Sequence, residues 1–321
     1  MTSQWSGQGL PPAAQARMAE IRASGTWGSA LSTDEFAAIK SVGFEPVGQV
    51  LGAAVYNLGF RGGYGCPSYG SFGSFSRMQP RWQQGTTAVS STGRASTYAP
   101  LVQTMYAARR AALGRMSAEC AQLGGHGVVG VLLTIGRFAG GGLEFKAIGT
   151  AVRAPGGIPL KQPFTSDVSG QDFAKLIMDG AVPVSLALGI SIGARHDDWL
   201  TMGQSRWTTG NTEVTGYTDL VNKTRHDARS ELQRDVRQMG GEGVVIQRMD
   251  MRVSEHECPA QEGRRDHVVE VTIVGTAITH FARPSRAAER PSLAVLSLDP
   301  QRRQAARVRL GGGPGGVPGV H

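Results

Sequence analysis

The chain has 321 residues, of which 40% are hydrophobic, so it is long enough for two ordinary domains of about 150 residues each. Its net charge of +8 lies mainly at the C-terminus, where residues 283–321 hold seven arginines and only two acidic residues. No apolar stretch approaches the roughly 18 residues of a membrane span, and residues 1–24 lack the apolar core of a secretory signal, so we expect a cytoplasmic protein without a membrane partner.

The sequence contains an internal repeat. Three motifs return 137 residues later: residues 32–36, 43–47 and 51–52 correspond to 169–173, 180–184 and 188–189. Two further motifs return at spacings of 116 and 126 residues: 123–129 as 239–245, and 149–151 as 275–277. Motifs that keep register in this way indicate a tandem duplication. The changes in spacing place a 21-residue insertion before the long helix of repeat 1 and a ten-residue insertion in the last hairpin of repeat 2.

Each repeat is predicted to begin with a short helix. Ser32 and Glu35 have the spacing of a capping box, and Ser169 and Asp172 have a related pattern. Runs of small and β-branched residues then predict a first strand at 47–56 and at 184–192.

A long amphipathic helix follows in each repeat. Its apolar side chains recur three and four residues apart, at Met105, Ala108, Ala112, Met116, Cys120 and Leu123, and at Val221, Thr224, Ala228, Leu232, Val236 and Met239. A glycine-rich turn and two strands complete the repeat, at 128–135 with 143–152 and at 244–253 with 268–278. The predicted fold class is α+β, with two tandem β-α-β-β domains that each combine an antiparallel sheet with one long helix.

The repeats divide the chain into five segments. Closely spaced prolines between the repeats favour a linker, and the glycine- and proline-rich C-terminus favours disorder. The segments are an N-terminal tail (1–30), repeat 1 (31–157), a linker (158–167), repeat 2 (168–283) and a disordered basic tail (284–321).

One helix can cover only one face of a sheet, and residues 128–135 are apolar on both faces. Either the two repeats pack on each other, or several chains close into a ring. We favour the ring, because exposed apolar patches of this size usually mark an interface.

The residues that carry the repeat resemble the YbjQ-like family, which is also called the heavy-metal-binding domain. The resemblance rests on Ala108, Arg109, Ala112, Leu113, Met116, Leu123, Gly124, residues 128–131 and residues 149–152. It implies a dodecin-like fold and a ring oligomer, pentameric in single-domain relatives, without an established catalytic mechanism. With two domains in one chain, such a ring would contain three or five chains. The sequence departs from the family at His126 and Glu242 in the two turns, and at Leu133 and Thr134 in the strand.

A polar cluster in the last hairpin of repeat 2 is the candidate metal site. It consists of Glu255, His256, Cys258 and His267. Thiolate and imidazole ligands suit a soft or borderline divalent metal such as zinc or copper. The alternative is a solvated hairpin tip, because repeat 1 lacks the insertion. Cys120 falls on the apolar stripe of the helix and is expected to pack in the core.

Two functions remain open, and neither is enzymatic, because no catalytic motif is present. The first is an oligomeric protein that binds a heavy metal or a small ligand. The second is a scaffold ring that recruits a protein or nucleic acid through the glycine- and aromatic-rich loop at 57–81 and through the basic tail.

Overall fold

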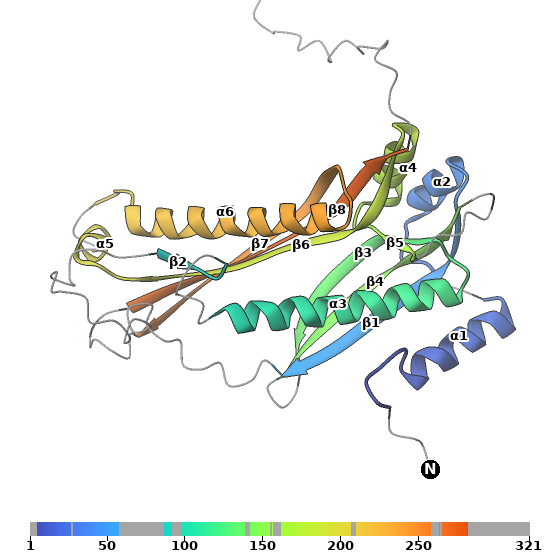
Figure 1. Ribbon diagram of the computed structural model, residues 1–321, viewed down its shortest axis with the longest axis horizontal. Helices are drawn as coiled ribbons and strands as arrows, with labels where there is room; N and C mark the ends of the chain where they lie inside the picture. The colour runs from blue at the N-terminus through green and yellow to red at the C-terminus, as the bar shows by residue number, and fades with distance from the viewer. Residues whose placement is uncertain are drawn as a thin grey trace, which may run out of the picture. The chain divides into compact units, whose positions relative to one another are not determined.

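The computed structural model describes most of both repeats (Figure 1). The described residues are 5–26, 28–57, 87–91, 98–138, 142–154, 156, 162–206, 210–257, 263 and 265–281. Cys258, residues 58–81 of the predicted recruiting loop and the tail from residue 284 lie outside them. Among the described residues, no helix has the length and hydropathy needed to cross a bilayer.

Repeat 1 has the predicted β-α-β-β order after its short first helix. Its elements are α2 (Thr33–Ser41), β1 (Glu45–Asn57), α3 (Ala99–Gln122), β3 (Gly127–Arg137) and β4 (Gly142–Arg153). The strands pair antiparallel, with β4 between β1 and β3. The capping box is confirmed, because the Ser32 hydroxyl accepts from the Glu35 backbone N–H and the Glu35 carboxylate accepts from the Ser32 N–H.

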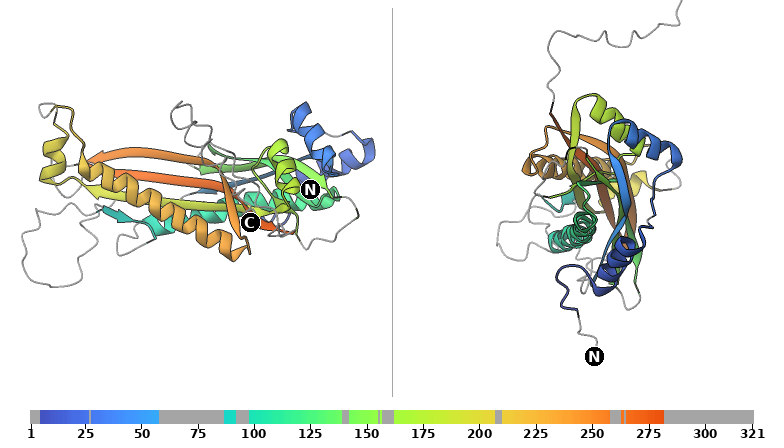
Figure 2. Two further views of the ribbon diagram at one scale, coloured as in Figure 1. Left: turned by 90° about the horizontal axis from the view of Figure 1, so that it is seen from above. Right: turned by 90° about the vertical axis from the view of Figure 1, so that its right-hand side faces the viewer.

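Repeat 2 follows the same plan. Its elements are α4 (Gly170–Met178), β6 (Ala181–His196), α6 (Thr215–Gln238), β7 (Gly243–Glu257) and β8 (Arg265–His280). Strand β8 lies between β6 and β7, as β4 lies between β1 and β3. Helix α4 lies beside α2 (Figure 2), and the Gly170 N–H donates to the Glu35 carboxylate at 3.1 Å. The tandem duplication is therefore visible in the fold.

The long helices press closely on the first strand of their own repeat. The predicted stripe on α3 is buried at Met105, Ala108, Ala112, Met116 and Cys120. A Cβ atom at Gly52 would lie 1.9 Å from the Ala112 carbonyl oxygen, and one at Gly189 would lie 2.2 Å from the Ala228 carbonyl oxygen. Each helix can pack against its strand only because glycine stands there.

The structure adds four short elements that the sequence did not predict: α1 (Pro12–Ser24), β2 (Thr87–Val89), β5 (Phe164–Thr165) and α5 (Trp199–Gln204). Helix α1 lies in the segment expected to be a tail. It is fixed by fully buried Met18 and by an ion pair between Arg17 and buried Glu119 on α3. Strand β2 of repeat 1 pairs with β6 of repeat 2, and β5 in the linker pairs parallel with β3.

Helix α3 packs on both sheets. Figure 1 shows α3 and α6 on opposite sides of strands β6 and β8. The first turns of α3 place Val102 and Met105 against Ile190 and Ile192 of β6, and the Ile190 N–H donates to the Tyr106 hydroxyl at 2.9 Å. Of the two alternatives left by the sequence, packing between the repeats therefore covers the second face of the repeat 2 sheet.

The second face of the repeat 1 sheet is only partly covered. Val55 of β1 is 48% exposed and Leu132 of β3 is 45% exposed. At one end of this face, helices α2 and α4 bury Val129 and Val152 together with Phe173. The part of this face that carries Val55 and Leu132 is therefore open among the described residues.

Candidate functional site

The predicted metal ligands lie on the hairpin formed by β7 and β8. Glu255 pairs across the strands with His267, and His256 pairs with Asp266. Because successive side chains of a strand point to opposite faces, Glu255 and His267 share one face and His256 lies on the other. The distance from the His267 Nε2 to the Glu255 Oε2 is 3.7 Å. The structure therefore brings two of the described candidates together and separates the third.

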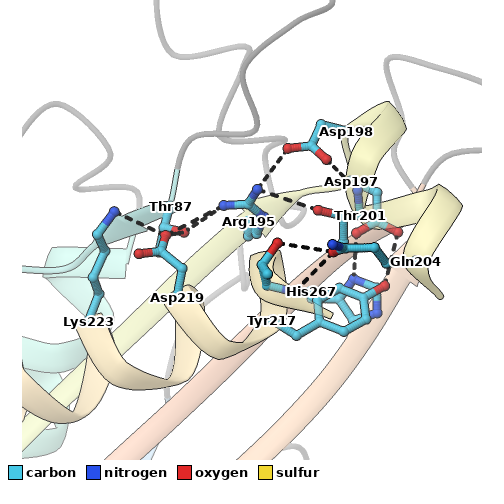
Figure 3. A network of polar contacts seen from close by, with 11 residues as sticks. Thr87, Arg195, Asp197, Asp198, Thr201, Gln204, Tyr217, Asp219, Lys223 and His267 are labelled. Carbon is cyan, nitrogen blue, oxygen red and sulfur yellow. Dashed lines mark hydrogen bonds and ion pairs between the residues drawn. The ribbon is translucent and has the colours of Figure 1, made fainter. Parts of the chain in front are cut away.

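The imidazole ring of His267 is held in place by Asp197 and Tyr217 (Figure 3). Its Nδ1 lies 3.1 Å from the Asp197 carboxylate, which also accepts a hydrogen bond from the Tyr217 hydroxyl at 3.3 Å. The Tyr217 and His267 rings lie 4.3 Å apart between centroids. Burial and the negative charge of Asp197 raise the pKa of Tyr217 to about 12. A carboxylate behind an imidazole is the arrangement that orients a metal-binding histidine, with Nε2 directed to Glu255.

The rest of the network in Figure 3 consists of internal pairs. Arg195 of β6 donates to Asp198 at 2.7 Å and to Thr87 at 3.1 Å, and Thr87 donates to Asp219 at 2.6 Å. These contacts tie β2, the start of α5 and α6 to one strand. Their role is to hold repeat 1 and repeat 2 elements together, because the charges are already matched.

The described residues do not complete a metal centre. No group of three or more His, Cys, Asp or Glu within them is placed to hold a metal ion. Glu255 and His267 supply two donors, where a structural zinc site uses four. His256 lies 3.2 Å from the Ser254 hydroxyl on the other face. The metal site predicted from the sequence therefore stays a prediction that depends on Cys258.

Two other residues singled out by the sequence have structural positions. The Cys120 side chain is fully buried, as predicted, and its Sγ lies 3.3 Å from the Gly127 carbonyl oxygen. Burial raises the pKa of this thiol to about 12, so it is not a reactive thiolate. His126 accepts a hydrogen bond at Nδ1 from the Ala154 N–H at 3.1 Å, which secures the turn before β3.

A pocket of about 340 Å³ lies between the two repeats. Helix α3, β3 and β4 form one side, and β7 and β8 form the other. Its charged lining residues are Arg109, Lys146, Arg248, Arg252, Asp250 and Glu270. The remaining walls are mainly apolar and include Leu133, Ile135, Phe145 and Val274. Four cations and two carboxylates line this pocket, which gives it an excess of positive charge.

Arg109 is the buried charge of this pocket. It is 4% exposed, its Nη2 lies 3.5 Å from the Thr272 hydroxyl, and its guanidinium carbon lies 5.8 Å from the Phe145 ring centroid. Its Nη1 has no hydrogen-bond partner among the described residues. Burial lowers the pKa of Arg109 to about 10 against the opposing effect of Glu270. In the sequence, Arg109 is marked only by the family resemblance, because its burial depends on the other repeat.

Strand β7 is the edge of its sheet and carries exposed apolar side chains. Met249 is 38% exposed, Met251 is 40% exposed and Val253 is 58% exposed. The corresponding strand of repeat 1, β3, pairs with β5 at Gly127 and Val128, and its Leu133 and Ile135 pack against the core. Among the described residues, no strand pairs with the outer edge of β7. A long open edge strand that exposes apolar side chains on one face can bind another strand.

Comparison with known proteins gives a family and one relative. The sequence profile of the YbjQ family, described as "Putative heavy-metal-binding", matches residues 85–155 and 202–280. The chain is also 31% identical over 285 residues to an encapsulin nanocompartment protein of Mycobacterium tuberculosis, strain ATCC 25618 / H37Rv. That alignment covers 84% of this chain and 91% of the relative. No solved structure matches the chain.

Proposed function

Because the chain belongs to the YbjQ family and carries two of its domains in tandem, we propose that it is a cytoplasmic, non-enzymatic protein that self-associates as part of a nanocompartment-type assembly. The observation that carries this proposal is the open edge of β7 with its exposed Met249, Met251 and Val253. The name of the mycobacterial relative supports assembly as the role.

The sequence of β7 is complementary to itself. In an antiparallel pair of two copies with the two-fold axis at Met251, Asp250 of each copy lies opposite Arg252 of the other, and Met249 lies opposite Val253. The two ion pairs share one face of the joined sheet and the apolar pairs share the other, because side chains alternate along a strand. Each such cross-strand pair contributes about 0.2–1 kcal/mol, and the unpaired backbone groups of both edges are satisfied at the same time.

This register commits the contact to a second copy of the chain. A different protein strand could also pair with the edge, but it would not be expected to present the reversed order of charges found at Asp250 and Arg252. A two-fold contact gives assemblies with an even number of chains. The ring of three or five chains expected from the family would need a head-to-tail contact instead, so the number of chains separates the two arrangements.

The test is the mass of the assembly in solution by size-exclusion chromatography with light scattering. Met251→Asp places two carboxylates at the axis and should convert the assembly to monomer. Met178→Asp is the matched control, because Met178 on α4 is 69% exposed and takes no part in the proposed strand pair; its assembly should keep the wild-type mass. A monomeric wild-type protein, or a Met251→Asp variant of unchanged mass, would contradict the proposal.

Metal binding is a second candidate function, favoured by the Glu255 and His267 pair with Asp197 behind it. Zinc or copper would be held by the imidazole and the carboxylate, with Cys258 as the further predicted ligand; His256, also predicted from the sequence, lies on the opposite face of the hairpin. Recruitment of a nucleic acid or a protein through residues 57–81 and the basic tail is the third. Salt-dependent polyanion binding that is lost when residues 283–321 are deleted would support that reading.

A further inference from the structure

The buried guanidinium of Arg109 needs a hydrogen-bond acceptor that the described residues do not supply. A guanidinium has five N–H donors, and buried donors are almost always paired. The Nη1 of Arg109 is buried and has no partner in the part of the chain that the structure describes, and the contact from Nη2 to Thr272 is long at 3.5 Å. Leaving a buried charged donor unpaired is more costly than leaving a neutral one unpaired. A fold that merely needed a side chain at this position could use an apolar residue.

The pocket around Arg109 has the features of a ligand site. Its volume of about 340 Å³ falls in the range of small-molecule pockets. Its lining is more polar than that of most such pockets, because six charged residues and two threonines stand beside the apolar ones. Arg248 from β7 adds positive charge, and Lys146 from β4 lies at the rim 3.5 Å from the Glu144 carboxylate. Asp250 and Glu270 oppose it, which leaves the lining with more cations than anions.

The larger pocket of about 680 Å³ beside α3 and α6 differs in this respect. Its arginines already have carboxylate partners: Arg110 lies 3.6 Å from Asp235, and Arg234 lies 2.6 Å from Glu231. Arg109 therefore differs from the arginines of this larger pocket, because no carboxylate among the described residues forms an ion pair with it.

We propose that the pocket between the repeats binds a small organic anion, whose carboxylate or phosphate head group accepts from the Nη1 of Arg109 and whose apolar body lies against Phe145 and Ile135. A planar guanidinium pairs with two oxygens of such a head group. Lys146 adds long-range attraction at the rim. The site joins both repeats, so the bound anion would also stabilise their packing. Asp250 and Arg252 also belong to the proposed β7 pair, but the head-group contact rests on Arg109, so this proposal does not require self-association.

The experiment measures the melting temperature of the full-length protein against increasing concentrations of four probes. Phenyl phosphate and benzoate carry an anionic head and an apolar body, inorganic phosphate carries the head alone, and benzyl alcohol is the neutral control. A saturable rise with phenyl phosphate or benzoate is expected, and the larger of the two rises identifies the head group. The absence of any saturable rise, or an equal rise with benzyl alcohol, would overturn the proposal. An equal rise with inorganic phosphate would overturn the role of the apolar body.

Arg109→Met keeps an unbranched, although shorter, side chain and removes the charge. It should weaken binding of the better probe at least tenfold while the protein without ligand melts at the same or a higher temperature. Arg225→Met removes a charge from the exposed face of α6 and should leave binding unchanged. If Arg109→Met does not fold, Lys146→Met at the partly exposed rim replaces it and should weaken binding by a smaller factor. Unchanged binding in either pocket variant would overturn the proposal.

Discussion

The close approach of each long helix to its first strand predicts that a single methyl group will separate them. Gly52→Ala would place a Cβ atom 1.9 Å from the Ala112 carbonyl oxygen and 2.6 Å from the Met116 nitrogen. Gly189→Ala would place one 2.2 Å from the Ala228 carbonyl oxygen. Carbon atoms need about 3.5 Å or more from such neighbours, so the helix must move outward by more than 1 Å, by this rough measure.

The obstructing atoms are helix backbone and cannot turn aside as a side chain could. Overpacking of a core costs about 1–3 kcal/mol, and we expect the upper end of this range, about 3 kcal/mol, for each variant. At about 2–4 °C per kcal/mol for a protein of this size, the melting temperature should fall by about 6–12 °C. The two variants should behave alike, because Gly52 and Gly189 occupy equivalent positions of the duplication.

The assay is thermal unfolding followed by circular dichroism. Gly114→Ala is the matched control, since this exposed glycine of α3 has no heavy atom within 4 Å of an added Cβ. It should raise the free energy of unfolding by about 0.5–1 kcal/mol, because alanine favours a helix over glycine. A Gly52→Ala or Gly189→Ala variant as stable as the wild type would refute this reading of the helix packing.

Three further outcomes are expected. Gly149→Val and Gly275→Val should both lower the melting temperature. A Cβ at Gly149 would lie 2.5 Å from Val128 Cγ1, and one at Gly275 would lie 2.7 Å from the Val245 carbonyl oxygen. An unchanged melting temperature in either variant would show that the bulged strands can move apart to make room. The buried Cys120 thiol, whose pKa burial raises from 9.0 to about 12, stabilises the fold fully below pH 9 and loses this contribution as the pH rises towards 12. Urea unfolding should therefore show the wild type losing about 2 kcal/mol relative to Cys120→Ala between pH 8 and about pH 10.5, and parallel curves would contradict the burial. Zinc bound to protein purified without chelator, measured by elemental analysis, should fall in His267→Ala if the hairpin holds it, and an unchanged zinc content would exclude that residue as a ligand.

Much of each repeat could be predicted because its signals are local. The Ser32 and Glu35 pair fixes the start of α2, and the stripe from Met105 to Cys120 defines the buried face of α3. The duplication strengthened both predictions, since each pattern occurs twice. The structure extends the predicted first strands at both ends, to Glu45–Asn57 and Ala181–His196.

The features that could not be predicted from the sequence depend on contacts between distant parts of the chain. Helix α1 has no strong apolar face, and its place is set by the pairing of Arg17 with Glu119 more than 100 residues away. The strands β2 and β5 are too short to give a sequence pattern and exist because the edges of β6 and β3 accept them. Arg109 becomes a buried, unpaired charge only when the second repeat packs on α3.

The number of chains in the assembly decides whether the open edge of β7 joins two copies. Native mass spectrometry of the untagged protein would report multiples of the 33.9 kDa chain. Pairing of β7 about Met251 predicts an even number of chains in the wild type and single chains in Met251→Asp. A wild type that stays a single chain, or an assembly of three or five chains that survives Met251→Asp, would contradict the claim that the open edge of β7 joins two copies.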